Sequence, residues 1–151
     1  MAFVLDASIT ACWAFQDEDH PDASLAFDRM RAEEGVVPSL WWFEVRNILI
    51  VNERRRRITE SDTAAFLLSL SRLRIRVDRV PDENGVLRLA RVHRLSAYDA
   101  AYLELAQREG LPLATLDADL RKAAAGERVA LVSMNAKEPE VSPPGPALSG
   151  K

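Results

Sequence analysis

The stretch Ala2-Phe3-Val4-Leu5-Asp6 is a short, unbroken apolar run closed by a carboxylate. A run of this length is typical of a strand buried on both faces, as in a parallel sheet. Similar short stretches predict further strands at residues 36–37, 75–77, 111–115 and 129–132. Ile75 and Val77 alternate with charged residues, which indicates a half-exposed or edge strand.

Helical patterns separate these strands. They predict helices over Pro21–Glu34, Trp41–Arg55, a segment opened by a Thr59–Asp62 capping box, residues 86–93, Ser96 to Gly110, and Asp117–Ala125. Short strands that alternate with helices imply βαβ crossovers, so the expected fold class is α/β, a mostly parallel central sheet with helices on both faces. Active sites in such sheets lie beyond the carboxyl ends of the strands.

Length and composition favour one globular domain followed by a tail. The chain has 151 residues and 48% apolar residues, enough for a core without staples. We expect a domain over residues 1–134 and a flexible Pro/Gly-rich tail over residues 135–151. One cysteine excludes an internal disulfide framework, and the absence of a long apolar run or a leader pattern predicts a cytoplasmic protein. The net charge of −3 argues weakly against non-specific nucleic-acid binding.

Nucleophile-based and phosphate-cradling chemistry has no support in the sequence. The glycine-rich phosphate loops and the nucleophile-elbow motif are absent from it. His20 lies in a charged turn, where solvent exposure is expected, and His93 lies on a helix stripe, where it is expected to be a packed or exposed helix residue. Cys12, beside Trp13, is expected to be a small core residue.

Four carboxylates are more informative. Asp6 and Asp117 follow predicted strands, Asp99 lies in the first turn of a predicted helix, and Glu44 stands inside a nearly unbroken apolar run. Helix capping or turn formation also explains the three aspartates individually. A carboxylate in the surroundings of Glu44 is costly unless it is exposed, paired or bound to a metal.

Several carboxylates at one sheet edge repel one another, which raises their pKa values unless a cation is present. A hard divalent cation such as Mg²⁺ or Mn²⁺ resolves this repulsion, because it prefers oxygen ligands and retains waters. The pattern therefore favours metal-assisted hydrolysis of a phosphodiester, in which a metal-activated water attacks phosphorus.

Two further features have open interpretations. The run Arg54, Arg55, Arg56 and Arg57 is either a solvated helix end or a contact for RNA phosphates or an acidic partner. Trp41 and Trp42 are expected to be core or partner-groove residues rather than base-stacking platforms.

Four segments together resemble PIN-domain ribonucleases, most closely VapC-type toxins of bacterial toxin–antitoxin (VapBC) pairs. They are Val4-Leu5-Asp6-Ala7-Ser8, Glu44-Val45-Arg46-Asn47 after Pro38-Ser39-Leu40, Leu95-Ser96-Ala97-Tyr98-Asp99-Ala100-Ala101-Tyr102-Leu103-Glu104-Leu105-Ala106, and Leu113-Ala114-Thr115-Leu116-Asp117-Ala118-Asp119-Leu120. The resemblance covers roughly residues 1–134, in the order and spacing of the family. It implies a three-layer α/β/α PIN-like fold and a Mg²⁺-dependent endoribonuclease, with Mn²⁺ as a substitute, that leaves 5′-phosphate and 3′-hydroxyl ends.

The resemblance also implies roles for individual residues. Asp6, Glu44, Asp99 and Asp117 fall on the acidic quartet of the family, with Asp6 and Asp99 as the leading metal ligands. Ser8 and Thr115 fall where hydroxyls support the acids, and Asp119 is either a fifth acid or the cap of its own short helix. A homodimer and a VapB-type antitoxin are the implied partners. An RNA-processing nuclease without an antitoxin, or a catalytically silent RNA- or protein-binding module, are the alternatives.

Overall fold

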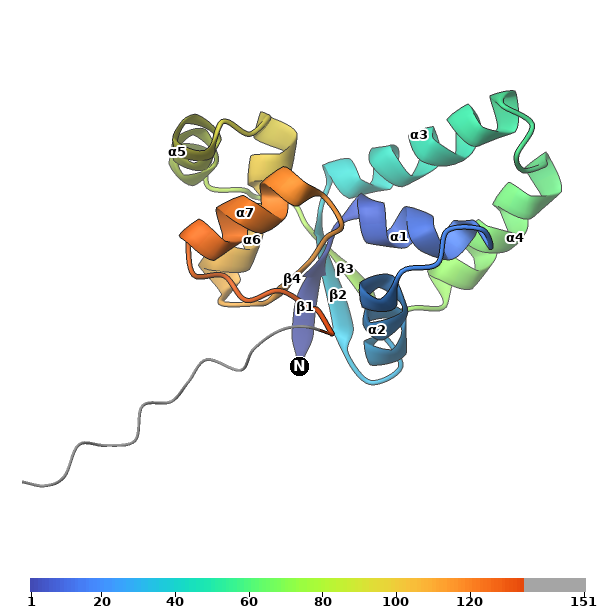
Figure 1. The fold of residues 1–151 in the computed structure, drawn as a ribbon, viewed down its shortest axis with the longest axis horizontal. Helices are drawn as coiled ribbons and strands as arrows, with labels where there is room; N and C mark the ends of the chain where they lie inside the picture. The colour runs from blue at the N-terminus through green and yellow to red at the C-terminus, as the bar shows by residue number, and fades with distance from the viewer. Residues whose placement is uncertain (135–151) are drawn as a thin grey trace, which may run out of the picture.

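The computed structural model describes residues 1–134 (Figure 1). The predicted tail over residues 135–151 lies outside the described residues. The strands are β1 (Ala2–Leu5), β2 (Glu34–Pro38), β3 (Ile75–Asp78) and β4 (Leu113–Ala114). The helices are α1 (Ala7–Ala14), α2 (Pro21–Arg29), α3 (Leu40–Arg54), α4 (Glu60–Ser71), α5 (Glu83–His93), α6 (Ala97–Glu109) and α7 (Ala118–Gly126). None of these described helices is long and apolar enough to cross a membrane.

The strands form one parallel sheet in the order β3-β2-β1-β4, which confirms the predicted α/β class. Val4 of β1 is in register with Val36 of β2 on one side and with Leu113 of β4 on the other. Helices α1 and α2 lie on one side of the sheet and α6 and α7 on the other (Figure 1). Because all four strands run in the same direction, the loops after β1, β2 and β4 meet at one edge.

The core covers both faces of the sheet, with α6 on one side and α1, α2 and α3 contributing buried residues on the other. Phe3, Val4 and Leu5 of β1 have no solvent-exposed surface, as the unbroken apolar run predicts. Residues 100–106 of α6 are all buried, because this helix packs against three strands and is covered by α5 and α7. The sheet edge that carries the candidate acids therefore adjoins deeply buried residues of β1 and α6.

Most predicted helix starts are confirmed. Thr59 and Asp62 form the capping box, and Ser96 caps α6, which ends at Gly110 in the left-handed conformation that glycine adopts freely. The strand at Ile75 and Val77 is confirmed at the sheet edge.

Several elements differ from prediction. The helix predicted over Pro21–Glu34 ends at Arg29, and Glu34 instead opens β2. The predicted strand 129–132 reduces to a single bridge between Leu131 and Leu113, and β4 itself comprises only two residues. Helix α1 was not predicted, because its sequence is apolar on all sides and shows no amphipathic stripe.

The residues set aside as non-catalytic take structural positions. Cys12 is buried, as predicted, and its thiol donates to the Glu18 carbonyl over 2.8 Å. His20 is only partly exposed, contrary to prediction, because it caps α2 by accepting the Asp22 amide at Nδ1. His93 is partly buried on α5, with Nε2 3.3 Å from a carboxylate oxygen of Glu127.

Candidate active site

Asp6 is the most buried acid of the candidate site. Its backbone amide donates to the Ala114 carbonyl, so it extends β1 by one residue beside β4, and its side chain is 5% exposed. Although Asp6 is the N-cap residue of α1, its carboxylate makes no capping hydrogen bond. Oδ2 instead accepts hydrogen bonds from Thr115 Oγ1 at 2.6 Å and Ser8 Oγ at 2.8 Å.

The two hydroxyls also fix the loop that follows β4. Ser8 Oγ accepts the Leu116 amide at 2.9 Å, and Thr115 Oγ1 accepts the Asp117 amide at 3.1 Å. Each hydroxyl therefore donates its hydrogen to Asp6 and accepts a backbone amide from the loop after β4. This network holds the loops after β1 and β4 against each other, which is the supporting position predicted for Ser8 and Thr115.

Glu44 reaches the same edge from the second turn of α3. Its carboxylate is half-buried, and Oε1 accepts a 2.6 Å hydrogen bond from the hydroxyl of Tyr102 on α6. Tyr102 is completely buried, and burial together with the Asp6 charge raises the pKa of its hydroxyl, which therefore remains a donor. The second oxygen of Glu44 is left to other partners.

Tyr102 was not assigned a role from the sequence. The signal was its position three residues after Asp99, which places both side chains on one face of the same helix. The spacing alone did not identify Glu44 as the acceptor, because 58 positions separate the two residues.

Asp99 and Asp117 both take part in helix capping, which was the alternative explanation for their presence in the sequence. The Asp99 amide donates to Ser96 Oγ at 3.1 Å, and Asp117 caps α7 by accepting the Leu120 amide at Oδ1 over 2.8 Å. Asp119 is exposed and does not cap α7, contrary to one of its two expected roles, because Asp117 already occupies that position.

Burial and mutual repulsion act on three of these acids. Burial raises the pKa of Asp6 despite the hydrogen bonds from Thr115 and Ser8, and the Asp117 charge adds to the shift. Burial also raises the pKa of Glu44, with contributions from Asp6 and Asp99. For Asp99, burial and then the charges of Asp117 and Asp6 raise the pKa. The predicted quartet is therefore one electrostatically coupled group.

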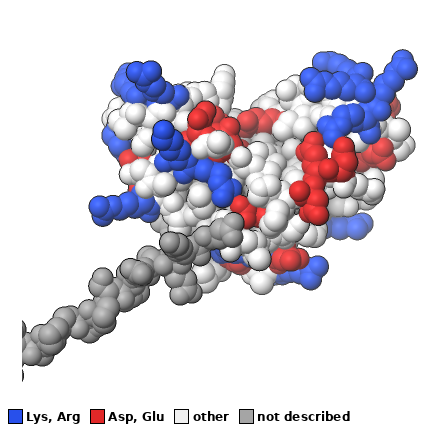
Figure 2. Space-filling model, in the orientation of Figure 1, with Lys and Arg blue, Asp and Glu red and all other residues white. Residues whose placement is uncertain are grey.

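The candidate acids form an open site and do not close around a metal position. Within residues 1–134, no three carboxylate, thiol or imidazole groups are close enough to enclose a metal ion as they stand. Figure 2 shows acidic surface in the saddle between the α3–α4 side and the α5–α7 side of the molecule. A hydrated Mg²⁺ fits such a donor set, because it is usually held by one or two carboxylates and keeps several waters.

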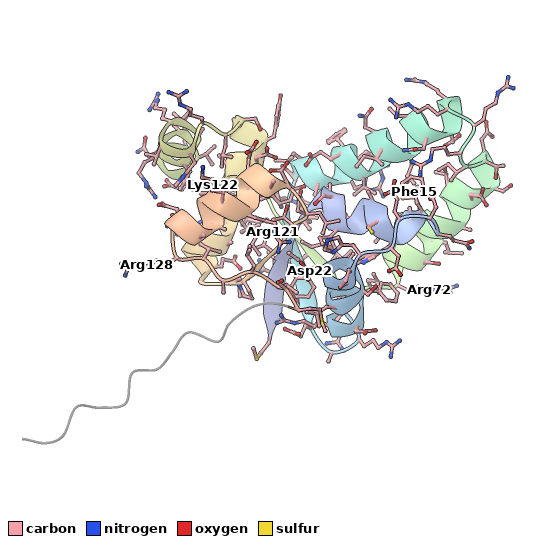
Figure 3. All side chains as sticks on the ribbon, viewed as in Figure 1. Phe15, Asp22, Arg72, Arg121, Lys122 and Arg128 are labelled. Carbon is pink, nitrogen blue, oxygen red and sulfur yellow. The ribbon has the colours of Figure 1, made fainter. Side chains whose placement is uncertain are left out.

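An ion pair between α7 and α2 supports the backbone of the loop that follows β4. Arg121 of α7 points toward Asp22 of α2 in Figure 3, and their side chains pair at 3.0 Å. The same guanidinium nitrogen donates to the Thr115 carbonyl at 3.0 Å, and the second Asp22 oxygen accepts the Met134 amide. Burial disfavours the charge on Asp22, but the Met134 amide and Arg121 outweigh it and lower the pKa of Asp22.

The neighbouring residues Trp41 and Trp42 differ in their exposure to solvent. Trp41 is buried in the core, as predicted, and its indole N–H donates to Thr10 Oγ1 at 3.0 Å. Trp42 is 48% exposed and lies beneath the Arg46 guanidinium, 4.0 Å from the ring centre.

Comparisons with known proteins identify the family and the fold. The model of the PIN domain family matches residues 3–126. A comparison with curated proteins finds no match. Among solved structures, PAE2754 from Pyrobaculum aerophilum is similar, with 25% identity over 87% of this chain and 84% of that chain and a TM-score of 0.66.

Two other solved structures share the fold. A toxin–antitoxin complex from Klebsiella pneumoniae has 17% identity, 82% coverage of this chain, 91% of that chain and a TM-score of 0.57. FitAcB from Neisseria gonorrhoeae has 16% identity, 87% and 96% coverage and a TM-score of 0.51. Because the family match covers most of the sequence, the chain belongs to the PIN domain family, whose members are generally metal-dependent nucleases.

Proposed function

We propose that this protein is a Mg²⁺-dependent endoribonuclease, with Mn²⁺ as a possible substitute, that acts as a VapC-type toxin. The observation that carries the proposal is the placement of Asp6: a buried carboxylate, held by Thr115 and Ser8, whose pKa is raised by burial and by the Asp117 charge. A buried anion with like-charged neighbours is poorly stabilised by the protein alone. A cation-binding role explains why these acids gather at one sheet edge.

Asp6 and Asp99 are the proposed leading metal ligands, and Glu44 and Asp117 complete the acidic pocket directly or through water. When bound, the divalent cation supplies charge neutralisation and an activated water for phosphodiester hydrolysis. Ser8 and Thr115 orient Asp6, and Tyr102 orients Glu44 by holding one of its oxygens. Asp119 adds negative charge at the rim and contributes to the raised pKa of Asp99.

The proposed partners are RNA as substrate, a VapB-type antitoxin that neutralises the enzyme, and a second copy of the chain in a homodimer. The structural likeness to the Klebsiella toxin–antitoxin complex supports the antitoxin proposal. We further propose that the protein acts in the cytoplasm, where its RNA substrate is found.

The direct test is cleavage of total RNA by the purified protein. We expect cleavage with Mg²⁺ or Mn²⁺, loss of cleavage with EDTA, and loss in both Asp6→Ala and Asp99→Ala. Asp28→Ala is the matched control, because Asp28 is an exposed carboxylate on α2 whose ion-pair partner within residues 1–134 is Arg31. Sequencing the RNA 5′ ends released by the wild type and missing with Asp99→Ala identifies the target.

The outcomes separate the alternatives. Full activity in both site variants contradicts the site assignment. RNA binding without cleavage under any divalent cation favours a silent binding module. Cleavage by a protein whose gene has no neighbour encoding a small DNA-binding protein favours an RNA-processing nuclease.

A further inference from the structure

The arginine run at the end of α3 divides into two parts with different surroundings. Arg57 is fully engaged within the protein: its guanidinium pairs with Asp17 and Glu18 and donates to Asn52 Oδ1 at 2.7 Å. It also lies 4.7 Å from the centre of the Phe15 ring. These contacts tie the α3–α4 connection to the end of α1, so Arg57 is a structural residue.

The other three arginines, Arg54, Arg55 and Arg56, form what we call the arm tip. All three are exposed, and in residues 1–134 their side chains have no ion-pair or hydrogen-bond partner. Arg56 adopts the left-handed conformation with φ of 57°, which is uncommon for a residue with a side chain. Five other arginines, Arg29, Arg76, Arg88, Arg108 and Arg121, are paired with carboxylates. Single exposed arginines such as Arg72 are also unpaired among the described residues, but the arm tip places three of them consecutively.

The arm tip lies at the far end of the helix that carries Glu44. Ten residues separate Glu44 from Arg54, which corresponds to about 15 Å along the helix axis. Helices α3 and α4 project away from the sheet, and Figure 2 shows a basic cluster at the outer end of this projection. A strand stacked as in a duplex carries one phosphate per about 3.4 Å of axis and an extended strand carries fewer, so at most about four phosphates lie between Glu44 and the arm tip.

We propose that the arm tip binds RNA backbone phosphates several nucleotides away from the bond that is cut. The proposal rests on the proposed function and adds the path that the RNA strand takes across the protein surface. Guanidinium groups that lack protein partners match phosphate oxygens through two parallel hydrogen bonds. Phosphate contacts of this kind position a strand without reading its sequence.

The surroundings favour RNA over an acidic protein as the occupant. From Arg54 to Asp62 the only apolar residue is Ile58, which is half-buried and packs on the core. A stable protein interface has an apolar centre, and residues 54–62 themselves offer none, although Ile50, one turn before Arg54, is 42% exposed. Two nearby acids are engaged locally, Glu53 with the Thr63 hydroxyl at 2.8 Å and Asp62 in its capping box.

The test compares RNA affinity and its salt dependence. In an Asp6→Asn background, which removes cleavage, fluorescence anisotropy measures binding of a labelled single-stranded RNA of about 20 nucleotides and of a labelled dinucleotide. The triple variant Arg54→Gln, Arg55→Gln, Arg56→Gln is expected to bind the long RNA about tenfold more weakly or worse. The slope of log K against log salt should fall in magnitude by about 2, or about 0.7 for each lost contact with a single strand.

Three controls fix the location of the effect. The short RNA is expected to bind both proteins equally, because it does not reach the arm tip. Arg72→Gln removes an exposed arginine at the other end of α4 and should leave both affinities unchanged. Glu60→Gln removes an acid beside the arm tip and should strengthen binding of the long RNA. Thermal unfolding of each variant confirms that it is folded.

Two results overturn the proposal while leaving the proposed function intact: equal affinity and salt slope in the triple variant, or equal losses for the long and short RNAs. If the triple variant instead keeps its RNA affinity but loses binding to a co-expressed antitoxin, the arm tip is a protein contact. Failure of the wild-type protein to bind or cleave any RNA removes the proposed function and this inference together.

Discussion

Thr115 Oγ1 donates a 2.6 Å hydrogen bond to Asp6 Oδ2, joining residues 109 positions apart in the sequence. The bond crosses from the loop after β4 to the end of β1. It orients the most buried carboxylate of the site and, through the Asp117 amide, positions a second acid. One hydroxyl therefore organises two of the four proposed catalytic acids.

Thr115→Val keeps the shape of the side chain but removes the hydroxyl. We expect a loss of about 1–3 kcal/mol in the free energy of unfolding, because a buried carboxylate and an amide each lose a partner. Cleavage should fall by about tenfold or more through misorientation of Asp6. Thr115→Ser is the control and should retain most of both properties; a fully active Val variant contradicts the orienting role.

Tyr102→Phe removes the donor to Glu44 and leaves the ring in the core. We expect a weaker affinity for Mn²⁺, measured by electron paramagnetic resonance, and about tenfold slower cleavage, because Glu44 loses its fixed orientation. Leu103→Val is a matched control, since it perturbs the same buried helix without touching an acid. If both variants change stability equally and neither changes Mn²⁺ affinity, Tyr102 is a packing residue only.

Asp99→Asn should abolish cleavage and at the same time raise the Tm of the metal-free protein. The pKa of Asp99 is raised by burial and by the charges of Asp117 and Asp6, so its ionised form is less favourable in the folded state than in the unfolded chain. Removing that charge relieves the repulsion. Calorimetry in EDTA measures the effect, and a lower Tm than wild type contradicts the electrostatic account.

The stabilisation that added metal provides should depend on pH. The pKa values of Asp6, Glu44 and Asp99 are raised by burial, so these three groups hold more protons in the folded state than in the unfolded chain above their ordinary values. Without metal, the contribution of these three acids to stability is therefore lost as pH rises from about 4 toward neutrality. Divalent cations bind the ionised forms, so the gain in Tm on adding Mg²⁺ should grow over the same range. A gain independent of pH would place the cation elsewhere.

Asp22→Asn tests the ion pair behind the site. The lowered pKa of Asp22 contributes stability that is present above the ordinary aspartate range and is lost as pH falls through the lowered value. We expect the variant to be less stable by about 1–3 kcal/mol at neutral pH and close to wild type in strong acid. A double-mutant cycle with Arg121→Gln isolates the pair, and strictly additive effects rule out coupling.

The elements that the sequence predicts well are those with local signals. Thr59 with Asp62 and Ser96 with Asp99 are separated by three positions, and their hydrogen bonds depend only on the first turn of a helix. Helix α1 escaped prediction because its residues show no amphipathic stripe, and the carboxylate of Asp6 at its N-cap bonds to Thr115 and Ser8 instead of capping the helix.

The positions of Asp6 and Asp117 were predicted from strand ends, whereas the partners of the candidate acids were not predicted. Asp6 and Asp117 were expected at one edge because parallel strands deliver their ends there. The contacts of Glu44 with Tyr102 and of Asp22 with Arg121 join residues 58 and 99 positions apart, and only the packed structure brings them together. The metal, the RNA target and the antitoxin stay predictions.

The shortness of β4 has a consequence for how the protein would lose activity. With two residues in the strand, its attachment depends on a few backbone bonds to β1 and on the bridge at Leu131. Local fraying of so small a unit requires less free energy than global unfolding. If β4 frays, the hydrogen bond between Thr115 and Asp6 is lost. We therefore expect heating to inactivate the enzyme below the temperature of the main unfolding transition, so that loss of activity reports detachment of β4 from the sheet.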